Sequence, residues 1–582
     1  CNGTKVIIPP AAHLQNSLLH KEEQLMFERF WHQFYDYNVP ATIRYPHISI
    51  PELLQIPANA LPDKAAVYFE GDEISFYGFR MLVMRMANAL EQLGVKKGER
   101  VGIQLPNCPP YLIAYYASLT LGAIIVNINP NYSREELHMI TETTGLSTLF
   151  TLQEASSSIE QLLNKVAVDR IILTRRKDYK PDEAPKKTHG AGPKNFHNFS
   201  DLLAGSTDTR RPRIDIGTHD PAIIQFTGGT TGVPKGAVLT HANMIASVMQ
   251  TSPRMFPIMQ FILPEKRRSL IIIPLYHVYG NLIANWSLFN CVTQVLVPRF
   301  QPDEVFDLLE KLGEVTYFPA VPTMLTALVN HPRIDEVELG RRVHIINSGA
   351  APCPVELIEQ LRDMNVFITE AWGMTESTSL GVVNPILGKK KPGSIGLPAP
   401  DNDIRIVDIN DGITEVPRGQ PGEMLLKGPS VMKEYWNNPQ ETAQQLVDGW
   451  LYTGDIVIQD EDGFLFIVDR KKDMIIAGGF NIYPREIDEV LFQHPKIQEA
   501  VTVGVHDPYR GETVKAFIVP RHGEIITPEE VISFCKERLA PYKIPREIEF
   551  RTELPKSAVG KVLRKILRDE EHRKRPEAQA EK

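Results

Sequence analysis

Glycine, threonine and lysine are concentrated in one segment, FTGGTTGVPKG at residues 226–236. Glycines let backbone N–H groups approach a polyanion, and threonine hydroxyls and a lysine ammonium group add donors and charge. The segment therefore predicts a phosphate-binding loop rather than a flexible surface turn. It is not a Walker A loop, because Lys235 stands between Pro234 and Gly236 and not before Ser or Thr. The candidate phosphate-binding residues are Thr227, Gly228, Gly229, Thr230, Thr231, Gly232 and Lys235.

The segments on either side of this loop favour a nucleotide site. Residues 221–226, PAIIQF, predict a short buried strand. From Ala237 onward, AVLTHANMIASVMQ has apolar residues at helical spacing, and Thr240 is a suitable N-cap residue. A strand, a phosphate loop and a helix in this order are typical of nucleotide binding, although the order does not identify the nucleotide.

Five more motifs follow the loop along the chain. They are SGAAP (348–352), EAWGMTES (370–377), LYTGD (451–455), IVDRKKDMIIAGGFNIYPREIDEVL (467–491) and LPKSAVGK (554–561). In sequence and order the six motifs resemble those of the adenylate-forming superfamily, which includes acyl-CoA synthetases, luciferases and peptide-synthetase adenylation domains. The latter half of the chain is particularly similar to bacterial long-chain fatty acid–CoA ligases.

The resemblance implies a two-step reaction that uses ATP, Mg²⁺ and CoA. A fatty acid carboxylate attacks the α-phosphorus of ATP, which gives acyl-AMP and releases pyrophosphate. The thiol of CoA then displaces AMP. Two negatively charged reactants must approach each other in the first step, so the site needs Mg²⁺, lysine and backbone dipoles to offset their charge.

The resemblance also assigns the nucleotide-binding residues. The loop from Thr227 to Lys235 would hold the β- and γ-phosphates. Trp372 stands where the family usually has a tyrosine that stacks on adenine, and an indole can stack equally well; a structural tryptophan is the alternative. The remaining ATP- or AMP-binding residues would be Gly349, Ala350 and Ala351 along the adenine, Gly373, Thr375 at the α-phosphate, Asp455 at both ribose hydroxyls, and Arg470 at the ribose or phosphate.

Three of these positions would take part in the chemistry. By resemblance, Lys561 would bridge the acyl carboxylate and the α-phosphate, Glu376 would hold Mg²⁺, and Thr375 would contact the α-phosphate. Without the motifs, Lys561 is one of several solvated lysines, and Thr375-Glu376 reads as a surface or capping pair.

The second half-reaction requires that the small domain rotate about a hinge, which the resemblance places at Asp469. Rotation would withdraw Lys561 and present Gly478, Gly479 and Phe480 to the pantetheine of CoA, with Arg510 near the CoA nucleotide. His277 lies where acyl-CoA synthetases have a residue of the fatty-acid pocket, and a core histidine with satisfied hydrogen bonds is as good an interpretation.

The predicted fold is α/β. A large N-terminal domain of buried mixed or parallel sheets with helices precedes a small, mobile α+β C-terminal domain. The predicted divisions are an N-terminal extension (1–45), the large domain (46–469), the small domain (470–568) and a charged tail (569–582). Residues 111–128 read as a helix followed by a buried strand, and residues 175–198 as a surface loop.

Composition narrows the function classes further. The formal net charge of −8 argues against nucleic acid binding. Five widely separated cysteines suit a reducing compartment and favour the cytoplasm; Cys353 beside SGAAP reads as a packed thiol rather than a nucleophile. No segment predicts a membrane span, while peripheral association with the inner face of the membrane and a homodimer stay open. Because the chain begins at Cys1, a trimmed sequence is favoured over a lipid-modified terminus.

A long-chain fatty acid–CoA ligase is the main hypothesis. The same chemistry on a medium-chain or aryl acid is one alternative, and a fatty acyl-AMP ligase that loads a carrier protein is another. A non-catalytic acyl-binding protein is disfavoured by the joint presence of Lys235, Glu376, Asp455 and Lys561.

Overall fold

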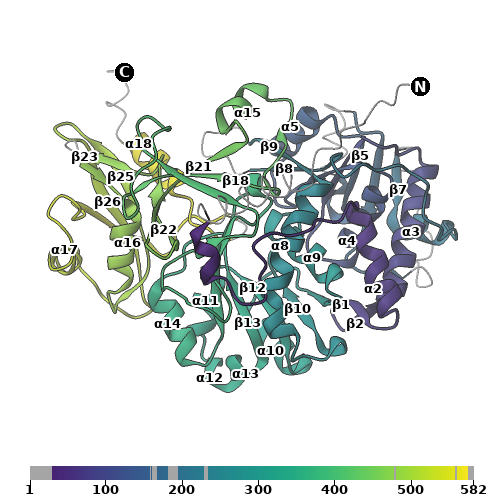
Figure 1. The fold of residues 1–582 in the computed structure, drawn as a ribbon, viewed down its shortest axis with the longest axis horizontal. Coiled ribbons are helices and arrows are strands. Elements are labelled where there is room, and N and C mark those ends of the chain that lie inside the picture. The colour runs from purple at the N-terminus through teal and green to yellow at the C-terminus, as the bar shows by residue number, and fades with distance from the viewer. Residues whose placement is uncertain are drawn as a thin grey trace, which may run out of the picture.

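The computed structural model describes residues 29–157, 159, 167–180, 195–227, 234–477, 480–557 and 560–574. Within these ranges the strands form two large and two small sheets, with helices packed on their faces (Figure 1). The predicted α/β fold, a large N-terminal domain followed by a small C-terminal one, is confirmed. Seven predicted site residues lie outside the described ranges: Gly228, Gly229, Thr230, Thr231, Gly232, Gly478 and Gly479.

The first large sheet has the strand order β19-β9-β8-β4-β3-β5-β6-β7. From β8 to β7 the neighbouring strands are parallel, as the prediction of buried parallel sheets requires. Its strands are β3 (Arg100–Gln104), β4 (Ile124–Asn127), β5 (Thr148–Leu152), β6 (Arg170–Thr174), β7 (Phe196–Asn198), β8 (Pro221–Phe226), β9 (Gly236–Thr240) and β19 (Glu434–Tyr435). The strand predicted at residues 221–226 is confirmed as β8. Strand β7 includes residues 196–198, which were predicted as loop.

The helix predicted from Ala237 begins later than its apolar spacing suggests. Helix α8 runs from His241 to Met259, and Thr240 is its N-cap residue, as predicted. Residues 237–240 belong to β9, which pairs antiparallel with β8 and is buried throughout. A short run of buried apolar residues has no polar face, so its spacing cannot distinguish a strand from the first turn of a helix.

The second large sheet has the order β16-β15-β14-β13-β12-β10-β11-β1-β2. Its strands are β1 (Ala65–Phe69), β2 (Asp72–Ser75), β10 (Arg268–Ile271), β11 (Thr293–Leu296), β12 (Val315–Ala320), β13 (Val343–Ser348), β14 (Ile368–Trp372), β15 (Val382–Val383) and β16 (Leu397–Pro398). Strands β12, β13 and β14 are parallel, so their carboxyl ends lie at the same edge. Loops that leave this edge are therefore neighbours, which is where open α/β sheets bind ligands.

Helices α4 (Pro109–Thr120), α8 and α9 (Val278–Phe289) lie in one continuous core with strands of both large sheets. The tyrosine hydroxyls of α4 donate to asparagines of α9, from Tyr115 to Asn281 at 2.9 Å and from Tyr116 to Asn285 at 3.0 Å. Helix α4 followed by β4 confirms the helix and strand predicted for residues 111–128. In the described part of the chain, no helix combines the length and apolarity needed to cross a bilayer.

The structure describes ten further helices in the large domain, which Figure 1 shows around its sheets. They are α2 (Gln55–Ala60), α3 (Phe76–Gln92), α5 (Arg134–Thr144), α7 (Phe199–Gly205), α10 (Pro302–Leu312), α11 (Pro322–Val329), α12 (Ile334–Val337), α13 (Leu339–Arg342), α14 (Val355–Asp363) and α15 (Pro439–Gln445).

A small antiparallel sheet follows, with strands β17 (Asp403–Val407), β18 (Gly422–Lys427), β20 (Leu446–Val447), β21 (Trp450–Gln459) and β22 (Leu465–Arg470). The pairing of β21 with β22 sets Asp455 opposite Arg470. Residues 30–35 pack beside this sheet, where Trp31 is buried with Leu397 and Phe464.

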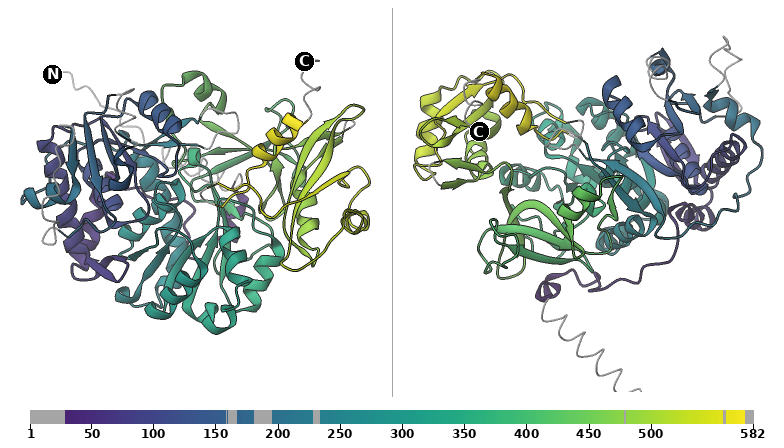
Figure 2. Two further views of the ribbon diagram at one scale, coloured as in Figure 1. Left: turned by 180° about the vertical axis from the view of Figure 1, so that it is seen from behind. Right: turned by 90° about the horizontal axis from the view of Figure 1, so that it is seen from above.

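The C-terminal domain has a mixed sheet and a core of its own (Figure 2). Its strands are β23 (Ile475–Ala477), β24 (Phe480–Ile482), β25 (Ile497–Asp507), β26 (Gly511–Pro520) and β27 (Glu547–Phe550), and its helices are α16 (Pro484–Phe492), α17 (Pro528–Lys536) and α18 (Arg564–Lys574). Among the strands described in this domain, only β27 pairs in parallel, with β26. The hinge and the domain boundaries at 45, 469 and 568 stay predictions.

Candidate active site

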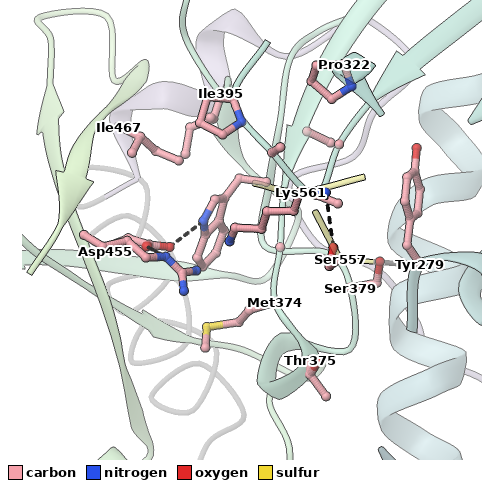
Figure 3. A pocket seen from close by; sticks show the side chains of 18 of the residues that line it. Tyr279, Pro322, Met374, Thr375, Ser379, Ile395, Asp455, Ile467, Ser557 and Lys561 are labelled. Atoms are coloured by element: carbon pink, nitrogen blue, oxygen red, sulfur yellow. Dashed lines mark hydrogen bonds and ion pairs between the residues drawn. The ribbon is translucent and has the colours of Figure 1, made fainter. Parts of the chain in front are cut away.

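A cavity of about 1250 Å³ lies where the edge of the second large sheet, the β21–β22 hairpin and the small domain meet (Figure 3). A pocket for one small ligand is typically about 300–1,000 Å³, so this cavity has room for more than one reactant. Its walls include every described residue predicted for the nucleotide, the metal, the hinge and the acyl group: Thr227, Lys235, His277, Gly349, Ala350, Ala351, Trp372, Gly373, Thr375, Glu376, Asp455, Asp469, Arg470 and Lys561.

The carboxylate of Asp455 is held between two donors from different elements. Asp455 lies on β21 and is 2% exposed. The indole Nε1–H of Trp372 donates to Oδ2 over 2.8 Å, and Nε of Arg470 lies 2.8 Å from Oδ1. A carboxylate has about four lone-pair positions, so each oxygen can still accept one ribose hydroxyl.

Glycines make room around Trp372 at the end of β14. A Cβ atom on Gly381 would lie 2.4 Å from the indole Cζ3, and one on Gly373 would lie 1.8 Å from the carbonyl oxygen of Ser379. Because neither position admits a side chain, both glycines are structural requirements of this turn. Figure 3 shows Met374 and Thr375 along the wall that this turn forms.

The SGAAP motif leaves the carboxyl end of β13 and runs along the cavity. A Cβ on Gly349 would be 3.3 Å from the ring of Tyr279, so the backbone here is closely packed. Ala350 has a φ of +65°, which is uncommon for a residue with a side chain. This small-residue wall is compatible with the predicted approach of adenine.

Glu376 is buried at 6% exposure in a short 3₁₀ segment, η6 (Thr375–Ser377). The hydroxyl of Tyr435 donates to its Oε1 over 2.6 Å, which orients the carboxylate. Burial, followed by the charge of Glu376, raises the pKa of Tyr435, so this phenol stays a donor. Oε2 of Glu376 is available to a cation. Oxygen ligands of this kind suit Mg²⁺, which takes further ligands from substrate phosphates and water.

In the described part of the chain, no group of three or more His, Cys, Asp or Glu residues could hold a metal ion by itself. The buried carboxylate of Glu376 fits a magnesium ion that takes its other ligands from the phosphates of ATP and from water. Glu376 would supply a protein ligand to that ion, and the ion would offset charge on the phosphates when bound.

Lys235 stands at the base of the phosphate loop. The N–H of Thr227 donates to the Lys235 carbonyl over 2.9 Å, so the two ends of the loop are joined. The ammonium group of Lys235 pairs with Glu441 at 2.5 Å and lies 5.4 Å from the centre of the Tyr435 ring. Tyr435 and Glu441 were missed in the sequence, because nothing local to residues 435–441 indicates that β19 pairs with β9.

Lys561 reaches the cavity from the small domain, and Figure 3 shows its side chain extending toward the side where Asp455 lies. The positive charge of Arg470, followed by burial, lowers the pKa of Lys561 to about 7. A Cβ on Gly560 would lie only 2.2 Å from the hydroxyl of Thr323, so this loop is inserted tightly against the large domain. The loop is closed locally by the Lys561 N–H, which donates to Ser557 Oγ over 3.1 Å.

His277 is both capped and part of the cavity wall. Its Nδ1 accepts the Tyr279 N–H over 3.2 Å at the start of α9. Burial, followed by the charge of Lys561, lowers the pKa of His277 to about 4, so the ring is neutral at pH 7. The wall of the same cavity also includes the apolar side chains of Met255, Leu282, Ile283, Leu380 and Val383. This histidine therefore has a structural role in addition to its predicted place at the acyl group.

Asp469 connects the two domains at the end of β22. Its Oδ1 accepts the Arg470 N–H over 2.7 Å, and its Oδ2 accepts the Arg485 N–H at the start of α16 over 2.8 Å. Arg564 of the small domain lies 4.0 Å away. Burial raises the pKa of Asp469, and these donors and Arg564 oppose that effect.

The structure does not bring the two described CoA candidates, Phe480 and Arg510, to the cavity. Phe480 is exposed and stacks on Tyr542 with ring centres 4.7 Å apart, and the backbone N–H of Arg510 donates to Asp507. Neither residue lines the cavity. Cys353 is buried, and burial raises the pKa of its thiol, which agrees with the prediction of a packed thiol rather than a nucleophile.

Relatives with known names resemble the chain over nearly its whole length. A long-chain-fatty-acid–CoA ligase of Bacillus subtilis (strain 168) is 39% identical over 557 residues, which cover 93% of this chain and 98% of the relative. A feruloyl-CoA synthase of Amycolatopsis sp. is 32% identical over 513 residues, covering 88% and 96%.

Solved structures share the fold. The anthranilate CoA ligase AuaEII in complex with anthranoyl-AMP superposes with a TM-score of 0.81 at 25% identity, covering 90% of this chain and 97% of that one. The o-succinylbenzoate CoA synthetase MenE of Bacillus subtilis, in complex with ATP and magnesium ion, gives a TM-score of 0.73 at 29% identity, covering 89% and 98%.

Family models match both parts of the chain. The model of the AMP-binding enzymes matches residues 54–436, and that of the AMP-binding enzyme C-terminal domain matches residues 486–561. These ranges contain the predicted phosphate-binding loop (226–236), the turn that follows Trp372 and the LPKSAVGK motif that ends at Lys561. The chain therefore belongs to the AMP-binding enzymes, the adenylate-forming superfamily that its motifs resemble.

Proposed function

We propose that this protein is a long-chain fatty acid–CoA ligase that forms AMP. The observation that carries the proposal is the position of Lys561, a small-domain residue, in one cavity with Asp455, Thr375 and Glu376 of the large domain and with Arg470 at the predicted domain boundary. Donors for a nucleotide, a ligand for its metal and a cation for an acid thus converge on one volume. The names of the relatives support the reaction class.

In the first half-reaction, a carboxylate oxygen of the acid forms a bond to the α-phosphorus of ATP, and the bond to pyrophosphate breaks. Thr375 and Lys561 would contact the oxygens on which charge builds, while Lys235 would act at the outer phosphates. Fixed donors in a site that excludes water stabilise such charge strongly. A bound triphosphate also favours the protonated form of Lys561, which Arg470 disfavours when the cavity holds protein groups alone.

In the second half-reaction, the sulfur of CoA forms a bond to the acyl carbon, and AMP leaves with the electron pair of the broken C–O bond. The tight contact between Gly560 and Thr323 must open if the thiol is to enter where the Lys561 loop now lies. We propose that the small domain rotates about Asp469 and brings Gly478, Gly479, Phe480 and Arg510 toward CoA. The exposed position of Phe480 in this arrangement is compatible with that rotation.

The acyl group is proposed to lie between α8, α9 and β15. Apolar side chains from all three elements line the cavity, beside Thr251 and Arg254 of α8, and this apolar surface suits an alkyl chain. The feruloyl-CoA synthase among the relatives keeps an aryl acid as the alternative.

A panel of acids tests both readings. Purified protein with ATP, Mg²⁺ and CoA is given octanoate, palmitate, oleate and ferulate, and AMP release is measured. The highest kcat/KM with palmitate or oleate is expected. A maximum with octanoate or ferulate would replace the long-chain proposal but keep the ligase chemistry. Pyrophosphate release without CoA-dependent AMP release would instead favour loading of a carrier protein.

Peripheral binding to the inner face of the membrane, from the cytoplasm, is proposed as a further property. Three apolar side chains at and just beyond the C-terminal end of α8 are exposed, Phe256 in its last turn at 49%, Phe261 at 85% and Leu263 at 63%. Met255, on the inner side of the same helix, lines the cavity. An apolar tip beside a lipid-binding cavity suits contact with a bilayer, where a fatty acid is dissolved.

Co-sedimentation with vesicles of phosphatidylglycerol and phosphatidylethanolamine tests this contact. The double variant Phe261→Ser, Leu263→Ser should lose binding, and Tyr509→Ser, which changes an equally exposed side chain on the small domain, should retain it. Equal binding by all three proteins would refute this surface.

A further inference from the structure

The indole N–H of Trp372 is directed at the carboxylate predicted to bind ribose, and stacking on adenine does not need such a bond. The side chain of Trp372 is buried, and Gly381 leaves no space on one side of the ring, where a Cβ would be 2.4 Å from it. The indole is therefore fixed in place, and its bond of 2.8 Å to Oδ2 of Asp455 is fixed with it.

The second oxygen of Asp455 is held independently. Nε of Arg470 lies 2.8 Å from Oδ1, on the strand that pairs with that of Asp455. Rotation of the carboxylate about its Cβ–Cγ bond would break both contacts. The two oxygens are thus presented in one orientation, each with a lone pair left for a further donor.

We propose that Trp372 is a positioning residue for ribose recognition: its N–H orients Asp455 so that both hydroxyls of a ribonucleotide, 2′ and 3′, are accepted together. This inference rests on the proposed function, and on the ribose contact that the family resemblance implies for Asp455. A tyrosine or phenylalanine has no ring N–H, so it could stack on adenine but leave Oδ2 free to turn.

The consequence is a preference for ribose over deoxyribose that depends on Trp372. With Arg470 alone, Asp455 would still be close to the sugar, but only Oδ1 would have a fixed direction. A charge-assisted hydrogen bond to a misdirected acceptor is weakened steeply. A Trp372→Phe variant should therefore lose more activity with ATP than with 2′-deoxyATP or 3′-deoxyATP. Each of these deoxynucleotides lacks one of the two hydroxyl donors.

The test compares Trp372→Phe with the parent in the adenylation half-reaction. Pyrophosphate release with palmitate is measured for ATP, 2′-deoxyATP and 3′-deoxyATP, without CoA. Trp372→Phe should lower kcat/KM for ATP by about tenfold, the factor that corresponds to ~1.4 kcal/mol, and should lower the ratio of ATP to either deoxynucleotide by a similar factor. Trp450→Phe is the matched control, because Trp450 lies on the same strand as Asp455 but does not line the cavity; it should change neither value.

A double-mutant cycle with Asp455→Ala separates positioning from stacking. If Trp372 acts through Asp455, then Trp372→Phe should not change the nucleotide ratio further in the Asp455→Ala background. An equal loss with all three nucleotides, or an unchanged ratio, would overturn the inference and leave Trp372 with a stacking or purely structural role. Because the parent's reaction with ATP is measured in the same experiment, failure of the proposed function would be seen separately as the absence of pyrophosphate release.

Discussion

Replacement of Lys561 by alanine should separate the two half-reactions. The side chain of Lys561 enters the cavity from the small domain, and Lys561 is the last residue of the SAVGK motif. In the first step charge builds on the α-phosphate and the acyl carboxylate, and Lys561 is placed to offset it. Removing one fixed donor of this kind typically lowers a rate by about 10²–10³. We therefore expect adenylation to fall by at least that factor.

Thioester formation from supplied acyl-AMP should be retained. Gly560 is in tight contact with Thr323 while Lys561 occupies the cavity, so Lys561 must leave with its loop before the thiol enters. A residue that has left cannot stabilise the second transition state. Pyrophosphate release measures the first step, and acyl-CoA formation from synthetic acyl-AMP measures the second.

Lys556→Ala is the matched control for this experiment. Lys556 lies on the same loop but pairs with Glu499 at 2.7 Å and does not line the cavity. Its loss should leave both half-reactions close to the parent rate. Equal losses in the two half-reactions of Lys561→Ala would refute the assignment of Lys561 to adenylation alone.

Three further predictions concern stability, the metal and the hinge. Because the pKa of Lys561 is about 7 in the folded protein against about 10.5 unfolded, the unfolded chain binds the extra proton between these values, and parent stability should rise with pH across that window. Lys561→Met should remove this rise. Its melting temperature should therefore exceed that of the parent at pH 7, and the difference should become smaller toward pH 9. If the melting temperatures of the two proteins change in parallel with pH, the lowered pKa of Lys561 is contradicted. Tyr435→Phe keeps the ring beside Lys235 but removes the donor to Glu376, so the Mg²⁺ concentration for half-maximal pyrophosphate release should rise about 10–100-fold; an unchanged requirement would exclude this role. Asp469→Pro fixes φ at the proposed hinge. In variant protein that its melting curve shows to be folded, acyl-CoA formation from acyl-AMP should stall while pyrophosphate release persists. Unchanged overall turnover would rule out the hinge.

Local signals in the sequence predicted those parts of the fold that local interactions determine. Thr240 was identified as an N-cap, and its hydroxyl does accept the Asn243 N–H in the capping box of α8. The helical interpretation of Ala237 to Thr240 was wrong, because these residues form β9. They are buried by pairing with β8 on one side and with β19 on the other. That burial depends on residue 435, which no window around residue 237 contains.

In the candidate site, too, contacts between residues far apart in the chain could not be predicted from local sequence. Motifs predicted Glu376 and Lys235, but their partners Tyr435 and Glu441 lie 59 and 206 residues away in the chain. Nothing in the spacing of those partners indicates a contact, since it is created by one short strand at the edge of a sheet. The bond from Trp372 to Asp455 likewise spans 83 residues and depends on the approach of β14 to β21.

The charges around Lys561 also give a physical reason for the order of the two steps. Arg470 and Lys472 repel its ammonium group, while Asp455 and Asp473 attract it, so protein groups alone hold the cation weakly, as its pKa of about 7 indicates. Bound ATP adds negative charge and favours the inserted loop. Release of pyrophosphate removes most of that charge and leaves acyl-AMP with a single ionised phosphate. Attraction for Lys561 then falls while repulsion by Arg470 persists, so product formation in the first step should itself favour withdrawal of the loop and entry of the thiol. Raising the pyrophosphate concentration should accordingly slow acyl-CoA formation from supplied acyl-AMP, and this inhibition should be weaker in Lys561→Ala.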